Sequence, residues 1–193
     1  MPFRVLLVCT GNVCRSPMAE RLLLAGLRER AGQGADAVLV SSAGTRALAG
    51  QPMTPATAAL VVRRGGDSQG HRARQLTREL VEEADLVLAL TREHRSAAAQ
   101  LHPPVLRRVL TLREAGRLAP LVPPDGLPEG LGERWRALAL GLPAARGAAP
   151  VRSASDDDVV DPYRRSQDVY EQCADQVLPA VTALLDAVAP RCG

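Results

Sequence analysis

Two cysteines and an arginine lie close together near the start of the chain, in the stretch VCTGNVCRSP at residues 8–17. Cys9 and Arg15 are six positions apart, and mainly small or polar residues separate them. Among these, Gly11 permits backbone angles that other residues avoid, and Asn12 tolerates the left-handed conformation. A loop of this kind is able to turn successive N–H groups inward around an anion. The stretch is therefore a candidate site for a tetrahedral phosphate.

Cys9 and Arg15 bring complementary chemistry to such a site. The planar guanidinium of Arg15 is able to bind two phosphate oxygens at once. Together with the inward N–H groups and the positive end of a helix that starts near Ser16, it favours the thiolate form of Cys9. A thiolate beneath a bound phosphate is placed for in-line attack on phosphorus, which would form a phosphocysteine intermediate. The residues expected to bind the phosphate are Thr10, Gly11, Asn12, Val13, Cys14 and Arg15.

The Cys-x5-Arg spacing alone is weak evidence, because all 24 basic residues of the 193-residue chain are arginines. The apolar run before it, the glycine inside it and the Ser-Pro helix start after it make the phosphate-loop interpretation much stronger. The alternatives are a structural cysteine and a metal ligand. The three histidines, at positions 71, 94 and 102, form no ligand cluster with the two cysteines, so we expect no metal and no other cofactor.

A candidate general acid lies in the stretch DDDVVDPYRRS at residues 156–166. The aspartates at 156–158 form a charge run, which we expect to be solvated. Asp161 differs, because it follows two valines and precedes Pro162, which fixes a turn. An aspartate on such a loop is suited to protonate the leaving oxygen of a phosphate ester. The adjacent Tyr163 is expected to line one wall of a substrate cleft.

The elements that must position these residues alternate along the chain. Apolar runs predict four strands, at 4–8, 37–45, 85–90 and 107–112, and helical patterns follow at 18–31, 54–64, 77–84, 92–101 and 166–189. Pro179 is expected to kink or interrupt the last helix. The alternation predicts an α/β fold with a four-stranded parallel sheet and helices on both faces. Ligands bind at the carboxyl ends of such strands, and the candidate phosphate loop leaves the first one.

Composition indicates one domain over 1–193, since 46% of the residues are hydrophobic. The net charge of only +3, with mixed signs along the chain, argues against a dedicated nucleic-acid binder. No apolar run is long enough for a transmembrane helix, and the N-terminal run is too short for a signal peptide, so we expect a cytoplasmic protein. The cysteines at 9, 14, 173 and 192 form no C-x-x-C pair and do not suggest a disulfide framework.

Residues 114–158 break the alternating pattern. They are rich in Pro, Gly, Ala and Arg and contain the only tryptophan, and 131–140 could form a short helix inside them. Two interpretations remain open: a flexible insertion, and a lid or partner surface.

The chain resembles the low-molecular-weight protein tyrosine phosphatase family, in a bacterial form. The resemblance begins with VCTGNVCRSPMAERL and continues in the same order through SSAGT (41–45), HRARQLT (71–77), ADLVLALTREH (84–94), DPY (161–163) and DVYEQC (168–173). Only residues 114–158 lie clearly outside it. The resemblance implies metal-independent hydrolysis of phosphate monoesters.

The resemblance also implies residue roles. Cys9 would be the nucleophile, Arg15 the phosphate and transition-state clamp, and Asp161 the general acid and then the general base. Cys14 corresponds to a second loop cysteine that traps the oxidised nucleophile in a reversible disulfide. Hydrogen bonds that hold the loop would come from Asn12, Ser16, Ser42 and His71.

Three departures from the family pattern concern the loop network and the substrate. Thr91 stands where the family often has an aspartate of the loop network. Arg164 follows Tyr163, where tyrosine-specific members often have a second aromatic residue, and residues 46–53 lack the large aromatic that some members use as the opposite wall. The sequence therefore indicates phosphatase chemistry more strongly than a phosphotyrosine slot.

Several functions compete with protein phosphotyrosine hydrolysis. Protein arginine phosphatases resemble the chain, but they carry Thr where Val13 stands, and a small-metabolite phosphatase is a further alternative. Arsenate reductases use extra cysteines in a segment corresponding to 77–95, which has none here. A non-catalytic phosphate-binding module would have no need of Cys9, Arg15 and Asp161 together. The expected partner is a phosphorylated protein or a small phosphate ester, and the oligomeric state is left open between a monomer and a weak dimer.

Overall fold

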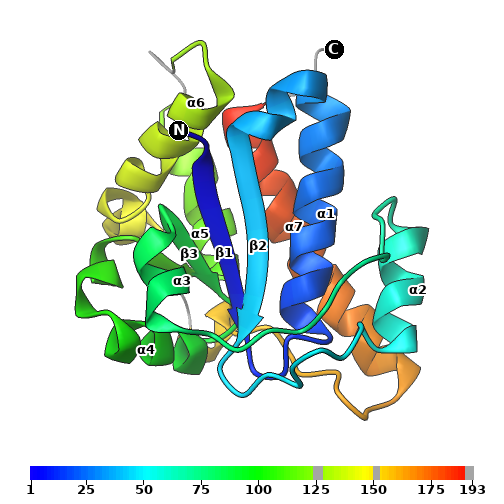
Figure 1. Ribbon diagram of the computed structural model, residues 1–193. Coiled ribbons are helices and arrows are strands. Elements are labelled where there is room, and N and C mark those ends of the chain that lie inside the picture. The colour runs from blue at the N-terminus through cyan, green and yellow to red at the C-terminus, as the bar shows by residue number, and fades with distance from the viewer. Residues whose placement is uncertain (124–127, 150–152, 190–193) are drawn as a thin grey trace.

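The computed structural model describes residues 1–123, 128–149 and 153–189 (Figure 1). Cys192 and the parts of the 114–158 segment at 124–127 and 150–152 lie outside the described residues. None of the helices in the described part combines the length and apolarity that a membrane crossing requires.

The centre of the fold is a sheet of four parallel strands, as the sequence predicts. The strands are β1 (Phe3–Cys9), β2 (Val38–Gly44), β3 (Leu86–Ala89) and β4 (Val109–Thr111), and their order in the sheet is β2-β1-β3-β4. Val5 pairs with Val40 on one side and with Leu86 on the other. β1 is thus an inner strand, so its carboxyl end lies at the middle of the sheet edge.

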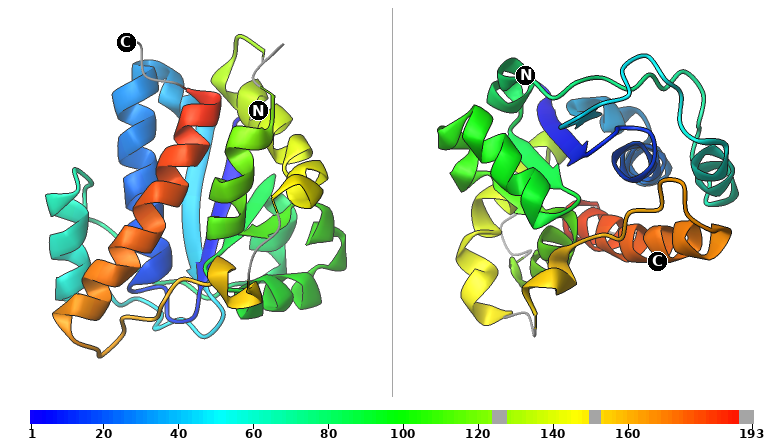
Figure 2. Two further views of the ribbon diagram at one scale, coloured as in Figure 1. Left: turned by 180° about the vertical axis from the view of Figure 1, so that it is seen from behind. Right: turned by 90° about the horizontal axis from the view of Figure 1, so that it is seen from below.

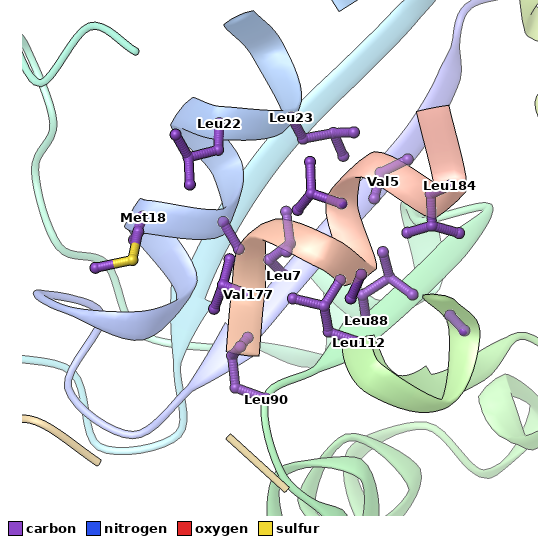
Figure 3. Packing of buried hydrophobic residues seen from close by; sticks show 14 of the residues in the cluster. Val5, Leu7, Met18, Leu22, Leu23, Leu88, Leu90, Leu112, Val177 and Leu184 are labelled. Atoms are coloured by element: carbon purple, nitrogen blue, oxygen red, sulfur yellow. The ribbon is translucent and has the colours of Figure 1, made fainter. Parts of the chain in front are cut away.

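Two apolar layers cover the sheet because side chains alternate along its strands. Phe3, Val5 and Leu7 of β1 belong to the larger core cluster, which also includes residues of α1 (Arg15–Ala31), α5 (Leu112–Leu118) and α7 (Gln167–Val188). Figure 3 shows Leu7 and Leu88 of the sheet against Val177 and Leu184 of α7. Leu6 and Val8 point to the other face, toward α3 (Arg78–Glu83) and α4 (Arg92–Leu101). The predicted fold class is therefore confirmed.

Threonines cap the N-termini of several helices. Thr54 caps α2 (Pro55–Arg63), Thr77 caps α3 and Thr91 caps α4, each accepting a main-chain N–H with its hydroxyl. Thr111 forms a reciprocal capping box with Glu114 at the start of α5. These caps fix where each of the four helices begins.

The helices bear on two sequence predictions, one at Pro179 and one at residue 114. The last helix, α7, runs without interruption through Pro179. The segment treated as an insertion from residue 114 begins inside a helix, α5, whose Gly116 packs against α7. A Cβ atom at Gly116 would lie 2.5 Å from Cα of Ala180, so the two helices approach at a distance that only glycine permits. Figure 2 shows α7 on the same face of the sheet as α1.

The predicted short helix in the 114–158 segment is α6 (Leu131–Gly141), and it is part of the core. Trp135 is fully buried and stacks on Phe3 with ring centroids 6.0 Å apart. Arg136 lies over the other side of the same cluster, 5.7 Å from the Phe3 ring, and forms an ion pair with Asp85 at 3.5 Å. Since Phe3 begins β1, α6 lies at the opposite end of the sheet from the candidate phosphate loop and does not cover it (Figure 1).

Candidate functional site

The loop between β1 and α1 has its carbonyl groups tied to the segment that follows β2. The N–H groups of residues 45, 46, 48 and 54 donate to the carbonyl oxygens of Cys9, Thr10, Gly11 and Val13, at 2.9–3.0 Å. A carbonyl that points outward leaves the neighbouring N–H groups to the centre of the loop. Gly44 permits this contact, because a Cβ atom there would lie 2.4 Å from the carbonyl oxygen of Thr10. The loop is thus arranged as a ring of amides around a small space.

Asn12 holds the loop from inside. Its backbone is left-handed, with φ of 55°, and its amide Nδ2 donates to the hydroxyls of Ser16 at 3.0 Å and Ser42 at 2.8 Å. Its Oδ1 accepts the main-chain N–H of Arg74 at 2.9 Å, and Nε2 of His71 donates to its carbonyl oxygen at 2.8 Å. The structure therefore brings together the four residues that the resemblance names as supports of the loop.

The sulfur of Cys9 lies at the bottom of the loop and is almost fully buried. The main-chain N–H of Asn12 donates to it at 3.3 Å, and Oγ of Ser16 lies 3.0 Å away. Because Ser16 Oγ already accepts from Asn12, its own proton is available to the sulfur. Two donors are thus directed at one sulfur, which lies at the N-terminus of α1.

Arg15 connects the loop with the segment that contains Asp161. Its side chain is only 6% exposed. Nη2 donates to Oγ1 of Thr10 at 3.1 Å and to Oδ2 of Asp161 at 2.8 Å, and Nη1 donates to the carbonyl oxygen of Val159 at 3.4 Å. Its Nε is buried and has no acceptor within the described residues. A buried donor without a partner is costly, so this edge of the guanidinium is suited to an anion in the loop.

Asp161 and Tyr163 form a turn at the mouth of the pocket. The carboxylate of Asp161 accepts the main-chain N–H of Tyr163 at 3.2 Å and is half exposed. The guanidinium of Arg164 lies 5.2 Å from the centroid of the Tyr163 ring. The pocket reaches from Cys9 and Arg15 outward to Leu48 and Tyr163, with Arg46 beside them. The predicted wall residue, Tyr163, therefore lines the same pocket as Leu48, which sequence reasoning did not identify.

The expectation of a solvated charge run is wrong for Asp157 and Asp158, which are partly buried and paired with arginines, whereas Asp156 is exposed. Asp158 accepts the main-chain N–H of Arg92 at 2.7 Å and its guanidinium at 3.0 Å. Asp157 pairs with Arg117 at 3.2 Å, and Asp156 accepts the N–H of Ser153 at 3.0 Å. Burial raises the pKa of Asp158, but the hydrogen bonds from Arg92 outweigh it and lower that pKa below its ordinary value. The run anchors the segment that leads to Asp161.

Sequence reasoning also missed a buried histidine beside the site. Nε2 of His94 lies 2.9 Å from Oγ1 of Thr10, and Nδ1 lies 2.8 Å from Oγ1 of Thr91. Burial, and then the charge of Arg15, lowers the pKa of His94 to about 4. The only signal in the sequence was its position at the start of the helix after the third strand.

Cys14 lines the same pocket as Cys9, and its sulfur lies among hydroxyl groups. Its Sγ is 3.5 Å from Oγ1 of Thr54 and 3.9 Å from the hydroxyl of Tyr170. Burial raises the pKa of the Cys14 thiol, and hydrogen bonds with these neighbours offset the shift only in part. Burial likewise raises the pKa of Cys173 to about 12. Both thiols are therefore protonated at neutral pH.

The described residues contain no group of three or more His, Cys, Asp or Glu side chains arranged to hold a metal ion. The donors directed at the centre of the loop are amides, hydroxyls and a guanidinium, which bind anions and not cations. The site is thus built for an oxyanion above the sulfur of Cys9.

The sequence matches the family model for low molecular weight phosphotyrosine protein phosphatase over residues 4–116. The chain is 34% identical over 189 residues to a low molecular weight protein-tyrosine-phosphatase of Streptomyces coelicolor, a match that covers 97% of this chain and 94% of the relative. It is 29% identical over 167 residues to the phosphatase Etp of Escherichia coli K12, covering 86% and 82% of the two chains.

Solved structures of phosphatases have a similar fold. A low molecular weight protein tyrosine phosphatase from T. tengcongensis superposes with a TM-score of 0.66 at 30% identity, covering 95% of this chain and 98% of the other. The arginine phosphatase YwlE from Geobacillus stearothermophilus also gives a TM-score of 0.66, at 25% identity, covering 96% and 92%. The resemblance noted from the sequence is confirmed: the chain belongs to the low molecular weight phosphotyrosine protein phosphatase family and is a cysteine-dependent phosphatase.

Proposed function

We propose that the protein removes phosphate from phosphotyrosine in proteins, with Cys9 as nucleophile, Arg15 as phosphate clamp and Asp161 as general acid and base. The proposal rests on two groups in one pocket: a cysteine sulfur with hydrogen-bond donors beside it, and a buried guanidinium nitrogen that lacks an acceptor. The sulfur of Cys9 is surrounded by donors, and the buried Nε of Arg15 has no acceptor within the described residues. A phosphate in the ring of amides would satisfy Arg15 and place phosphorus above the sulfur.

The first half of the reaction transfers the phosphoryl group to the enzyme. The Cys9 thiolate attacks phosphorus, a sulfur–phosphorus bond forms, and the bond from phosphorus to the phenolic oxygen breaks. Asp161 gives its proton to that oxygen, so that tyrosine leaves as a neutral phenol. Arg15 and the loop amides stabilise the negative charge on the equatorial oxygens.

The second half returns the enzyme to its starting state. A water molecule attacks the phosphocysteine from the side that the phenol has left, and the Asp161 carboxylate accepts its proton. The sulfur–phosphorus bond breaks, inorganic phosphate leaves, and the Cys9 thiolate forms again. Asp161 therefore ends the cycle with the proton that it needs for the next substrate.

The contact between Arg15 and Asp161 indicates that phosphate binds to Arg15 before Asp161 donates its proton. Nη2 of Arg15 donates to Oδ2 of Asp161 at 2.8 Å. A phosphate dianion that binds Arg15 releases Asp161 from this contact. Asp161 is then able to turn toward the leaving oxygen of the substrate.

The shape and charge of the pocket mouth support an aryl phosphate. Leu48 and Tyr163 both line the pocket and offer apolar surface to an aromatic ring, and Arg46 adds positive charge. Arg164 adds a second cation, stacked on Tyr163. A neutral phenyl ring enters such an opening without penalty, whereas the guanidinium of phosphoarginine would meet two like charges. This favours phosphotyrosine over phosphoarginine, although YwlE has a similar fold.

We further propose that the protein acts in a bacterial cytoplasm. Cys9, Cys14 and Cys173 are free thiols, and a reducing compartment preserves the thiolate that the chemistry requires. We also propose that 1–193 is one phosphatase domain and that most of the 114–158 segment is an addition to it. Support comes from Trp135 of α6, which packs into the same core as β1.

A substrate panel tests the proposal. The kcat/KM values are measured for phosphopeptides that differ only in carrying phosphotyrosine, phosphoarginine or phosphoserine, and for a sugar phosphate, with Cys9→Ser as the control. We expect phosphotyrosine to be the best substrate by at least about tenfold, and Cys9→Ser to be inactive while it remains folded. A faster reaction with phosphoarginine would show that phosphoarginine, and not phosphotyrosine, is the preferred substrate. Full activity of Cys9→Ser would refute the mechanism.

A further inference from the structure

A line of hydrogen bonds joins Arg15 to the start of α4. Nη2 of Arg15 donates to Oγ1 of Thr10 at 3.1 Å, and this oxygen lies 2.9 Å from Nε2 of His94. On the other edge of the imidazole ring, Nδ1 of His94 lies 2.8 Å from Oγ1 of Thr91. His94 is only 3% exposed, so both nitrogens of a buried ring have a hydroxyl partner.

The charge of Arg15 sets the direction of these bonds. A guanidinium only donates, so Thr10 Oγ1 accepts from Arg15 and keeps its own proton for Nε2 of His94. This arrangement turns the lone pair of Nε2 toward the cation, which is the favourable orientation of the neutral ring. Nδ1–H then donates to Thr91, whose hydroxyl also accepts the main-chain N–H of His94 at 3.3 Å.

The ring is neutral under the conditions in which the enzyme works. Burial is the main reason why the pKa of His94 lies at about 4; the charges of Arg15 and Arg46 act in the same direction, and Asp158 opposes them. A neutral imidazole fixes the hydroxyl of Thr10 without placing a second positive charge beside Arg15.

The other partners of Arg15 belong to the segment that must move. Asp161 has to leave Arg15 in order to protonate the substrate, and Val159 lies two residues before it on the same segment. Thr10 is part of the phosphate loop itself. Its bond to Arg15 is therefore the side-chain contact that remains when the site is filled.

We propose that His94 is a positioning residue for the phosphatase reaction: through Thr10 it holds the guanidinium of Arg15 in the orientation that binds the transferring phosphoryl group. The inference rests on the proposed function and adds a residue to it. Because Arg15 acts most strongly on the transition state, losing the bond between His94 and Thr10 is expected to lower kcat more than it changes KM.

Two substitutions at one position separate the two contacts of the ring. Glutamine places its amide near the position of Nε2 and keeps a partner for Thr10, whereas asparagine reaches only to the position of Nδ1. We expect His94→Asn to lower kcat for an aryl phosphate by about tenfold with KM within about twofold, and His94→Gln to stay within about threefold of wild type. His102 is a buried histidine at the other end of α4, and His102→Asn is the matched control, with unchanged kcat. Equal losses in the Gln and Asn variants, or a larger loss in the Gln variant, would overturn the proposal.

Thr10→Val provides an independent test that leaves α4 intact. It keeps the shape of the side chain but removes the hydroxyl, and we expect a similar fall in kcat. The double variant Thr10→Val/His94→Asn should have a kcat no lower than that of the slower single variant, because both changes remove the same bond. Losses that multiply would contradict the role of His94. A wild-type protein that does not hydrolyse the aryl phosphate would instead refute the proposed function, whereas an active wild type with full-rate variants refutes only this inference.

Discussion

At the scale of single residues, three parts of the site meet at the guanidinium of Arg15. Its nitrogens contact the phosphate loop through Thr10 and the segment before α7 through Val159 and Asp161, and its Nε is left for an anion. A lysine has the same charge but lacks the planar arrangement of donors that makes these contacts together.

We therefore expect Arg15→Lys to lower kcat/KM for an aryl phosphate by at least about a hundredfold, which corresponds to about 2.7 kcal/mol of transition-state stabilisation. Steady-state kinetics at several substrate concentrations measure the loss. A lysine variant within a factor of about three of wild type would contradict the clamp role of Arg15.

Asp161 is expected to matter in proportion to how poor the leaving group is. Asp161→Asn removes the proton donor, so kcat should fall most for phenyl-type phosphates and least for esters of acidic phenols, which leave without help. The measurement is kcat across leaving groups of graded pKa. Asp168, an exposed aspartate in the first turn of α7, provides the control, and Asp168→Asn should follow the wild-type dependence. A flat dependence in both variants would mean that another group is the acid.

Cys14 is expected to protect oxidised Cys9, but slowly at neutral pH. Its raised pKa keeps most of it as the thiol, whereas capture of an oxidised sulfur requires the thiolate. After mild peroxide treatment, reductant should restore activity in wild type and poorly in Cys14→Ser, and the protection should become faster as the pH rises above neutral. Equal recovery in both proteins would leave Cys14 with a packing role alone.

The residues that could be predicted from the sequence are those that lie in short, ordered motifs. Cys9 and Arg15 share one loop, and Asp161 stands beside a proline, so local spacing was sufficient to find them. Asp157 and Asp158 were wrongly expected to be solvated, because their partners, Arg117 and Arg92, are remote in the sequence. His94 was missed for the same reason, since Thr10 is 84 positions away from it.

At the scale of elements, the contact between α5 and α7 depends on one glycine, Gly116. The atoms nearest to a Cβ at Gly116 belong to the backbone and Cβ of Ala180, so a methyl group there forces the helices apart. We expect Gly116→Ala to lower the free energy of unfolding by about 1–3 kcal/mol.

Urea unfolding measures this change. Gly147→Ala is the matched control, because nothing lies within 4 Å of a Cβ at that position, and it should change stability by less than about 0.5 kcal/mol. If Gly116→Ala were as stable as the control, the helices would have to separate at no cost, and the packing described for this pair would be wrong.

The strands and most helices could be predicted because their apolar patterns are continuous and their caps are local. α5 could not, since it is only seven residues long, follows β4 directly and begins the Pro- and Gly-rich segment whose composition suggested a loop. The uninterrupted course of α7 through Pro179 was also beyond local rules, because packing of the helix against α1 and α5 outweighs the hydrogen bond that proline removes.

At the scale of the whole molecule, helix packing closes one end of the sheet, and the candidate site occupies the other. The strand starts are closed by α6, whose Trp135 lies on Phe3, and the strand ends hold the site. We expect Trp135→Ala to lower the free energy of unfolding by about 3–5 kcal/mol, because it leaves a large cavity. Well below the melting temperature, kcat/KM should stay within about threefold of wild type. Chemical denaturation and kinetics on the same samples measure both, and a large loss of activity in a fully folded variant would mean that α6 acts on the site.

Arg46 and Leu48 have two separate tasks in this molecule. Their main-chain N–H groups hold the carbonyls of Thr10 and Gly11, whereas their side chains line the mouth of the pocket. The support of the loop does not depend on which side chains these two residues carry. A substitution at either position is therefore expected to change substrate preference without loss of the catalytic chemistry. Evolution or protein engineering is then able to reach new specificities through a series of active enzymes.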